Sequence, residues 1–421
     1  MTRPPMLVLL NALVLVVFVG CAEYQEVYDP PDFGSTATDN RIAAMLVGGL
    51  VGDAAGGPVE FVDPSRWDEP GVPFKRWSPG ERFPTTEDGL DAYGSALQLM
   101  PYAVFRPEPE PYAHWRNDAP PGTLTDDTRH KLVVIDAIRR SKAPPTEGEL
   151  ARAYLRAADD WTEFADTALV EDNLREYLYA ARWVVGERDP SRALPPTRIW
   201  AALPTCAGQM ALPPLAGLAP GNPDAAYRFA HDAAFFDTGP AKDTNAAFVA
   251  GLAFALTLEA PSPGGRRAAW QQVKSVMREC DPYRYDDVPW TTRPIHRVLD
   301  TAERLAEESQ GEPAALIAAI EGLTPPIRDR AWWESDIILI MAFAAIELAD
   351  AHPTASMRLA IELGYDTDST AQAVGLVLGA MNGLSVFPRA LRDPPRQTLR
   401  SDYNADVDEW TELLHQVREP G

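Results

Sequence analysis

Apolar residues recur along most of the chain at the three- and four-residue spacing of amphipathic helices. The alternation of apolar and polar positions that marks a half-buried strand is nearly absent. The pattern therefore predicts an all-α fold, and we expect one helical domain with long loops. Helices are expected at residues 41–56, 128–141, 148–160, 171–186, 223–235, 245–258, 267–279, 294–309, 313–321, 335–350, 354–363 and 369–383. Residues 57–122, which are rich in Pro, Gly and aromatic residues, are expected to form a long irregular excursion.

Two of the predicted helices carry glycine at every fourth position. These glycines are Gly48, Gly52 and Gly56 in the first helix and Gly375, Gly379 and Gly383 in the second. Each interior glycine costs a helix about 1 kcal/mol relative to alanine. A stripe of glycines lets another backbone approach closely, so we expect both stripes to lie at tight buried contacts. Chance glycines in helices rich in small residues are the alternative.

The first 21 residues have the pattern of a bacterial export signal. Arg3 supplies a positive charge, and residues 6–19 are apolar except for Asn11. This run is shorter than the about 20 residues of a typical membrane-spanning helix, and its length is typical of a secretory signal. It leads into Phe18-Val19-Gly20-Cys21, which resembles the lipobox of bacterial lipoproteins.

The lipobox-like end predicts that Cys21 is lipidated and becomes the new N-terminus. We therefore expect a lipoprotein signal peptide at 1–21, a flexible tether at 22–40 and a folded domain at 41–421. The chain would be an exported protein that is anchored to a membrane of the cell envelope through its N-terminal lipid only. An ordinary cleaved signal followed by a chance cysteine is the alternative.

The charge balance limits the possible partners. The chain of 421 residues has 61 acidic and 38 basic side chains and a formal net charge of −23. Such a surface repels polyanions, so we expect no nucleic acid partner. Solubility explains much of this charge, but some of the carboxylates could gather around cations.

Cysteine and histidine give no support to a zinc site. After Cys21 only Cys206 and Cys280 remain, which are too few for a cysteine metal site, and a disulfide between them stays open. The six histidines include no pair spaced four residues apart, as a zinc protease helix requires.

Two short acidic segments stand directly before predicted helices. They are Thr125-Asp126-Asp127-Thr128 and Asp366-Thr367-Asp368-Ser369-Thr370. Capping explains one such residue at each helix start, because Thr and Asp accept hydrogen bonds from free backbone N–H groups. Two neighbouring carboxylates repel each other and are more than a cap requires. Since Mg²⁺ and Mn²⁺ prefer oxygen ligands, the two segments together favour a metal site.

Other acidic motifs fit these segments poorly. An EF-hand loop that starts at Asp366 would need Gly at 371 and Glu at 377, where the chain has Ala371 and Val377. A DDxxD motif would need Asp at the position of His130. A haloacid-dehalogenase motif would need a buried parallel strand, which the helical pattern does not provide.

Four segments occur in an order that points to one family. Residues 41–61 combine the first glycine helix with a small-residue turn and Glu60-Phe61, and residues 125–128 and 364–369 contain the acidic segments. Residues 387–391 form a Pro-containing exit from the second glycine helix. Together these segments resemble the ADP-ribosylglycohydrolase family over residues 41–391.

The resemblance implies an all-α fold with two Mg²⁺ or Mn²⁺ ions in a central cleft. By position, the ligands would be Thr125, Asp126, Asp127, Asp366, Asp368 and Ser369. Glu60 would lie beside the metals. The reaction would be hydrolysis of the glycosidic bond of an ADP-ribosyl or related ribosyl substrate, with Glu60 or a metal-bound aspartate such as Asp127 moving the proton.

The chain departs from the family pattern where the substrate would bind. The middle motif, usually Ser-Asn-Gly leading to Met-Arg, is here Thr205-Cys206-Ala207-Gly208-Gln209-Met210-Ala211 and lacks the Arg. Tyr365 stands where the family often has Gly, and residues 57–122 are longer than the usual connection. Three functions therefore stay open. The chain is a metal-dependent hydrolase of ADP-ribosyl or related ribosyl linkages, a catalytically inactive metal- or nucleotide-binding protein that keeps the fold, or a hydrolase of another nucleoside or glycoside.

Overall fold

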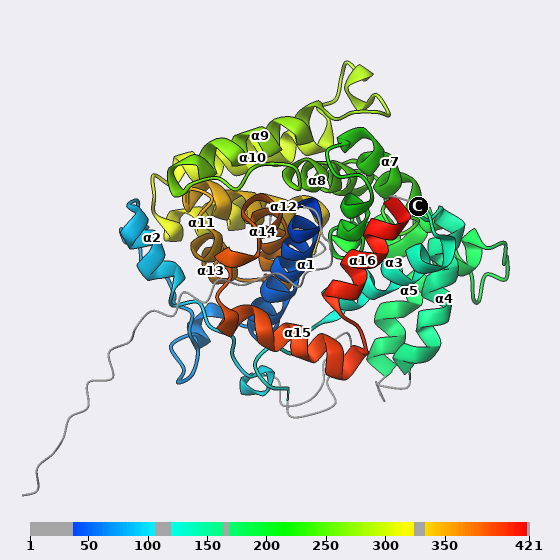
Figure 1. Cartoon of the computed structure of the whole chain (residues 1–421), viewed down its shortest axis with the longest axis horizontal. Coiled ribbons are helices and arrows are strands. Elements are labelled where there is room, and N and C mark those ends of the chain that lie inside the picture. Colours follow the sequence, from blue (N-terminus) through cyan, green and yellow to red (C-terminus); the bar gives the residue numbers. More distant parts are fainter. Residues whose placement is uncertain (1–36, 106–118, 163–167, 324–332, 419–421) are drawn as a thin grey trace, which may run out of the picture. The chain divides into compact units, whose positions relative to one another are not determined.

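The computed structural model of the chain describes residues 37–105, 119–162, 168–323 and 333–418 (Figure 1). Most of these residues are helical, and none of them belongs to a named β-strand. One isolated bridge pairs Thr205 with Glu334. The predicted all-α fold is confirmed.

All twelve predicted helices are present, with ends within four residues of those expected. They are α1 (Ala37–Gly56), α3 (Asp126–Ser141), α4 (Glu147–Thr162), α5 (Ala168–Val184), α7 (Pro223–Ala233), α8 (Ala241–Ala255), α9 (Arg266–Glu279), α10 (Pro294–Glu308), α11 (Pro313–Leu323), α12 (Ser335–Leu348), α13 (Pro353–Glu362) and α14 (Thr367–Asn382). The helices α2 (Glu87–Gly94), α6 (Ala207–Ala211), α15 (Arg389–Tyr403) and α16 (Val407–Arg418) were not predicted.

The expectation for residues 57–122 was partly wrong, because this segment contains α2. The side chain of Thr86 caps α2 by accepting a hydrogen bond from the backbone N–H of Gly89 at 3.2 Å. A capping residue such as Thr86 can be recognised in the sequence. However, α2 has only 8 residues and few apolar positions, so its apolar periodicity is too weak to predict a helix. The segment thus adds an ordered element to the fold.

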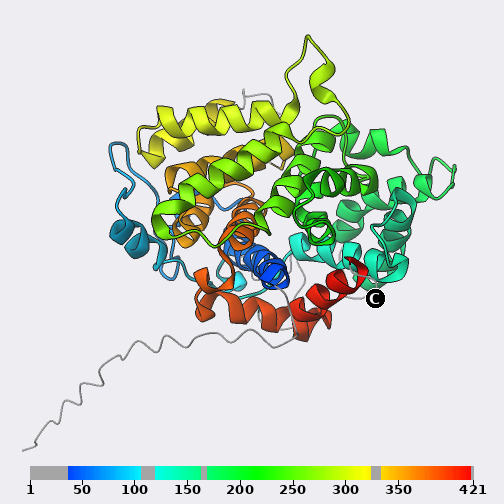
Figure 2. The same cartoon turned by 45° about the horizontal axis from the view of Figure 1, so that its top comes forward.

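The helices α1 and α14 lie side by side in the middle of the helical domain (Figures 1 and 2). A Cβ atom added to Gly48 would lie 2.1 Å from the carbonyl oxygen of Gly375, and one added to Gly52 would lie 2.2 Å from that of Ala371. The two glycine stripes therefore pack backbone against backbone, and the predicted tight contact is confirmed. Gly383 has another role, since it ends α14 with a φ of +87°.

The segment Ala37–Val59, which includes α1, is long and apolar enough to cross a membrane by length and composition. However, 94% of its most apolar stretch is buried inside the protein. Because its neighbours are other helices of the domain, α1 is a core helix. The predicted signal peptide at 1–21 and Cys21 lie outside the described residues.

Candidate metal centre

The two acidic segments meet at the N-terminal ends of α3 and α14. The Ser369 hydroxyl donates a hydrogen bond to Asp127 Oδ2 at 3.2 Å, and the Gln372 side-chain amide donates to Asp127 Oδ1. These residues are more than 240 positions apart in the chain. The tertiary fold therefore brings the predicted ligand segments into direct contact.

Five carboxylates form two groups that share Asp368. Oxygens of Glu60, Asp366 and Asp368 lie within 4.8 Å of one another, and so do oxygens of Asp126, Asp127 and Asp368. Asp368 is buried, and its Oδ2 has no hydrogen-bond partner among the described residues. A buried carboxylate oxygen without a donor is costly unless a cation compensates it. Two groups bridged by one aspartate fit a pair of cations.

Helix capping fixes the acidic segments in place. Thr125 caps α3 by accepting a hydrogen bond from the Asp127 N–H at 3.3 Å, and Asp366 caps α14 by accepting one from the Ser369 N–H at 3.3 Å. The capping interpretation is thus correct for one residue of each segment. The other carboxylates of the two segments are not needed as caps, and they point into the shared centre.

The close contact between α1 and α14 places Glu60. Thr367 donates its hydroxyl proton to the carbonyl oxygen of Gly56 at 2.8 Å, which joins the end of α1 to the start of α14. The chain then makes the short helix η1 (Gly57–Val59), and Glu60 follows it. Phe61 N–H donates to the carbonyl oxygen of Tyr365 at 2.7 Å. Glu60 is therefore held beside Asp366 and Asp368 by backbone contacts on both sides.

Burial and mutual repulsion raise the pKa values of Asp126, Asp127 and Asp366. Desolvation, followed by the charge of Asp368, raises the pKa of Asp126 to about 8 and holds that of Asp127 well above its usual range. The same two causes raise the pKa of Asp366. Burial and repulsion therefore favour the protonated forms of these three carboxyl groups. A divalent cation would favour their charged forms instead.

Four residues of the centre were not predicted from the sequence. Asp53 accepts hydrogen bonds from Thr125 N–H at 3.0 Å and from the Thr128 hydroxyl, and burial raises its pKa to about 6. Lys131 donates to the carbonyl oxygen of Asp127 at 2.8 Å. The remaining two are Gln372 and Cys206, whose thiol lies 4.0 Å from Asp366 Oδ2.

Sequence signals existed for some of these residues. Asp53 and Lys131 are charged residues within apolar helical runs, which is unusual unless the charge is paired. Gln372 stands one turn after Asp368 on the same helix. Cys206 stands in the middle motif of the sequence pattern, which indicated a place near the substrate but no contact with Asp366. The sequence left a disulfide between Cys206 and Cys280 open, and in the structure both thiols are free and buried.

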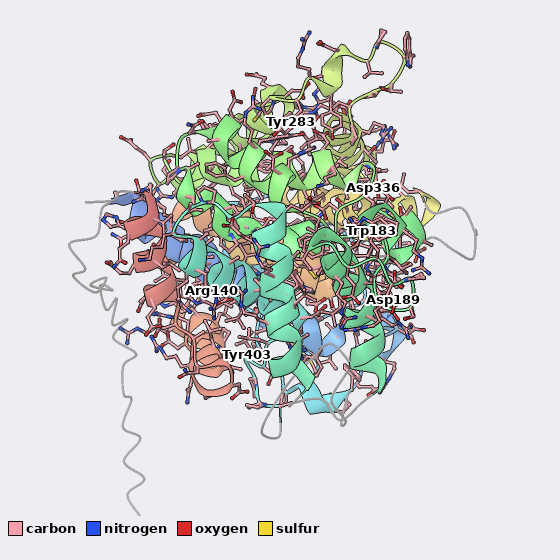
Figure 3. All side chains as sticks on the ribbon, turned by 90° about the vertical axis from the view of Figure 1, so that its right-hand side faces the viewer. Arg140, Trp183, Asp189, Tyr283, Asp336 and Tyr403 are labelled. Atoms are coloured by element: carbon pink, nitrogen blue, oxygen red, sulfur yellow. The ribbon has the colours of Figure 1, made fainter. Side chains whose placement is uncertain are left out.

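Contacts from α15 support the segment before α3. The hydroxyl of Tyr403, which is labelled in Figure 3, donates to the carbonyl oxygen of Leu124 at 3.3 Å. Leu124 directly precedes Thr125, the cap of α3. An unpredicted helix near the C-terminus thus positions a predicted ligand segment.

A third cluster, made of Glu87, Asp91 and His352, has a different role. His352 Nδ1 accepts a hydrogen bond from Ala355 N–H at 3.3 Å, so it caps α13. In the neutral imidazole the proton then lies on Nε2, which faces Asp91 Oδ1 at 2.9 Å. A metal would need the lone pair of that nitrogen. The cluster is therefore a helix cap with an outer acidic partner.

Comparisons with known proteins concern the family and the fold. The family model described as ADP-ribosylglycohydrolase matches residues 34–420. A solved structure described as an ADP-ribosylglycohydrolase-related protein complex has 20% sequence identity and a TM-score of 0.50, covering 91% of this chain and 99% of that chain. At this identity the likeness concerns the fold. No curated protein matches the chain.

Proposed function

The chain belongs to the ADP-ribosylglycohydrolase family, and on this premise we propose that it is a divalent-metal-dependent hydrolase of ADP-ribosyl or related ribosyl substrates. The observation that carries the proposal is the pair of carboxylate groups bridged by Asp368. All the oxygen donors are of the type that Mg²⁺ and Mn²⁺ prefer. The proposed ligands are Thr125, Asp126, Asp127, Asp366, Asp368 and Ser369.

Two divalent cations in this centre would polarise substrate hydroxyls and make bound water a stronger nucleophile. Glu60 and Asp127 are the candidates for moving the proton. Both oxygens of Asp127 accept hydrogen bonds, from Ser369 and Gln372, which suits a fixed ligand. Glu60 belongs to the group with Asp366 and Asp368 and directly precedes the exposed Phe61. We therefore assign proton transfer to Glu60.

An aromatic pair beside Glu60 supports a substrate with a flat ring. Phe61 and Trp333 meet edge to face with centroids 6.2 Å apart, and they are 42% and 41% exposed. The carbonyl oxygen of Trp333 accepts a hydrogen bond from Cys206 N–H at 2.9 Å, which ties Trp333 to the centre. Large exposed aromatic rings are typical of binding surfaces. This pair is the proposed contact for the base of an ADP-ribosyl group.

Turnover assays with proteins that carry ADP-ribose on arginine or on serine test the proposed function. We expect release of ADP-ribose with Mn²⁺ or Mg²⁺ and none with excess chelator. Glu60→Gln should lower kcat by about 10²- to 10⁴-fold, the usual contribution of a general acid or base, while calorimetry still shows cation binding.

Glu69→Gln is the matched control, because Glu69 is exposed and forms a surface ion pair with Arg66. Chelator-resistant turnover, or full activity of Glu60→Gln, would contradict the proposal. Cation binding without release from either linkage would instead favour an inactive binding protein.

We also propose that the chain is exported and anchored by a lipid on Cys21. The support is the apolar run at 6–19 and its lipobox-like end. Expression in a bacterial host with a labelled fatty acid should label the wild-type chain and not Cys21→Ser. Equal labelling of both chains would rule out Cys21 as the lipidation site.

A further inference from the structure

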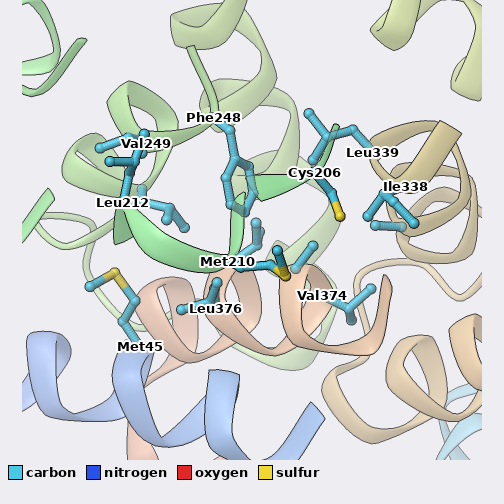
Figure 4. Close-up of a cluster of buried hydrophobic side chains, with 14 of the residues drawn as sticks. Met45, Cys206, Met210, Leu212, Phe248, Val249, Ile338, Leu339, Val374 and Leu376 are labelled. Atoms are coloured by element: carbon cyan, nitrogen blue, oxygen red, sulfur yellow. The ribbon is translucent and has the colours of Figure 1, made fainter. Parts of the chain in front are cut away.

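Cys206 places a thiol at the boundary between the apolar core and the carboxylates. Its Sγ lies 4.0 Å from Asp366 Oδ2 and 3.8 Å from the Ser369 hydroxyl oxygen. Figure 4 shows its other neighbours, which include Ile338, Leu339 and other apolar side chains. The thiol thus faces the acidic centre from a wall that is otherwise apolar.

The loop that carries Cys206 is held firmly in place. Cys206 N–H donates to the carbonyl oxygen of Trp333, and Gly208 N–H donates to Asp237 Oδ1 at 3.1 Å. The Gln209 side chain donates to Asn245 Oδ1 at 3.0 Å. Contacts on both sides of Cys206 therefore hold the backbone from which the thiol reaches Asp366.

An independent feature of the same carboxylate group indicates a cation. Asp368, which belongs to the group with Glu60 and Asp366, is 1% exposed, and its Oδ2 lacks a hydrogen-bond donor among the described residues. Such an oxygen is compensated when a cation binds. Because Asp368 belongs to both carboxylate groups, an ion that compensates this oxygen would lie in the centre that Cys206 faces.

The distances allow one ion to contact both sulfur and oxygen. Zn²⁺–sulfur and Zn²⁺–oxygen bonds are about 2.3 Å and about 2.1 Å, so one ion reaches two such atoms up to about 4.4 Å apart. Cys206 Sγ and Asp366 Oδ2 are closer than this, at 4.0 Å. Thiolate is a soft ligand that favours Co²⁺ and Zn²⁺ over Mg²⁺.

We propose that Cys206 is a further metal ligand that makes the Asp366 side of the centre selective for thiophilic divalent cations. The proposal rests on the metal centre of the proposed function. The thiol proton is released to solvent when the ion binds. If Cys206 acted only as a weak S–H donor to Asp366, its removal would leave the preference among cations unchanged.

Titration of the full chain with Co²⁺ tests this proposal, because a cobalt–thiolate bond gives a charge-transfer band in the near ultraviolet. We expect the band in the wild-type chain and its loss in Cys206→Ser. Calorimetry should show Co²⁺ affinity lowered about tenfold or more in that variant, as for other changes at metal sites, with Mg²⁺ affinity little changed.

Cys280→Ser is the matched control, since Cys280 is also a buried free thiol and donates to Asp224 at 3.3 Å. Cys280→Ser should keep the charge-transfer band. A band that persists in both Cys206→Ser and Cys280→Ser would come from Cys21 and would contradict the proposal. Co²⁺ binding without a sulfur band would overturn the proposal and leave the oxygen-ligand centre intact. Absence of Co²⁺ binding in the wild-type chain would overturn both. Unfolding by heat checks that Cys206→Ser is folded.

Discussion

Asp368→Asn is expected to abolish the binding of both divalent cations and, with it, hydrolysis. The reason is that Asp368 belongs to both carboxylate groups, so its loss removes a charged ligand from each. Changes to outer partners of metal ligands already cost about 10- to 100-fold in affinity or activity, and the loss of a shared ligand should exceed this. Calorimetry with Mn²⁺ and turnover of an ADP-ribosylated protein would measure the two effects.

The same variant should fold at least as well as the wild type when metal is absent. The charge of Asp368 contributes to the raised pKa values of Asp126, Asp127 and Asp366, which reflects repulsion. Asparagine has the same shape and can still accept the hydrogen bond from Ser369 N–H. We therefore expect an unchanged or higher Tm in chelator and no further rise with Mn²⁺.

Asp91→Asn is the matched control for Asp368→Asn. Asp91 belongs to the cluster with Glu87 and His352, in which the histidine caps a helix. This variant should keep wild-type cation affinity and turnover. A rise in Tm with Mn²⁺ that is as large in Asp368→Asn as in the wild type would refute the shared-ligand assignment.

Local signals explain why the sequence predicted most of the fold. Helix periodicity and caps act over a few residues, and Thr125 and Asp366 both cap helices where the sequence placed helix starts. The helix α16 was not predicted, although its sequence has the helical pattern. Val407, Trp410 and Leu414, which are buried, stand three and four residues apart.

The helix α15 shows where local reasoning fails. Pro394 and Pro395 lie inside it, and proline in a helix interior removes a backbone hydrogen bond and costs about 3 kcal/mol. The sequence alone therefore argues against a helix. Burial of Leu391 and Leu399, and the contact of Tyr403 with Leu124, stabilise it in the fold.

The residues of the metal centre are likewise of two kinds: those that a local sequence pattern predicts, and those whose contacts depend on the tertiary fold. The acidic residues at the two helix starts stand next to each other in the sequence and could be recognised there. Cys206 lies 160 positions from Asp366, and Gln372 lies 245 positions from Asp127. The packing of α3, α6 and α14 brings these pairs together, so a local pattern could point to the residues but could not predict the contacts between them. The metal roles themselves remain predictions.

Gly375→Ala is expected to destabilise the whole domain, because it separates the two central helices. Its new Cβ would lie 2.0 Å from the carbonyl oxygen of Gly48. A helix cannot shift its backbone at one residue alone, so the two helices would have to move apart. Overpacking a core typically costs about 1–3 kcal/mol, and a clash between two backbones should reach or exceed the upper end. Denaturant unfolding should therefore show a large fall in the transition midpoint.

The effect should extend to the metal centre, since α14 carries Asp366 and Asp368 at its N-terminal end. Any folded Gly375→Ala chain should bind Mn²⁺ more weakly than the wild type. Gly322→Ala in α11 is the control, because a Cβ there meets no atom of the described part of the chain within 4 Å. That change should be neutral or stabilise the chain by up to about 1 kcal/mol, the helix preference for alanine. Equal unfolding midpoints for Gly375→Ala and the wild type would disprove the tight contact between α1 and α14.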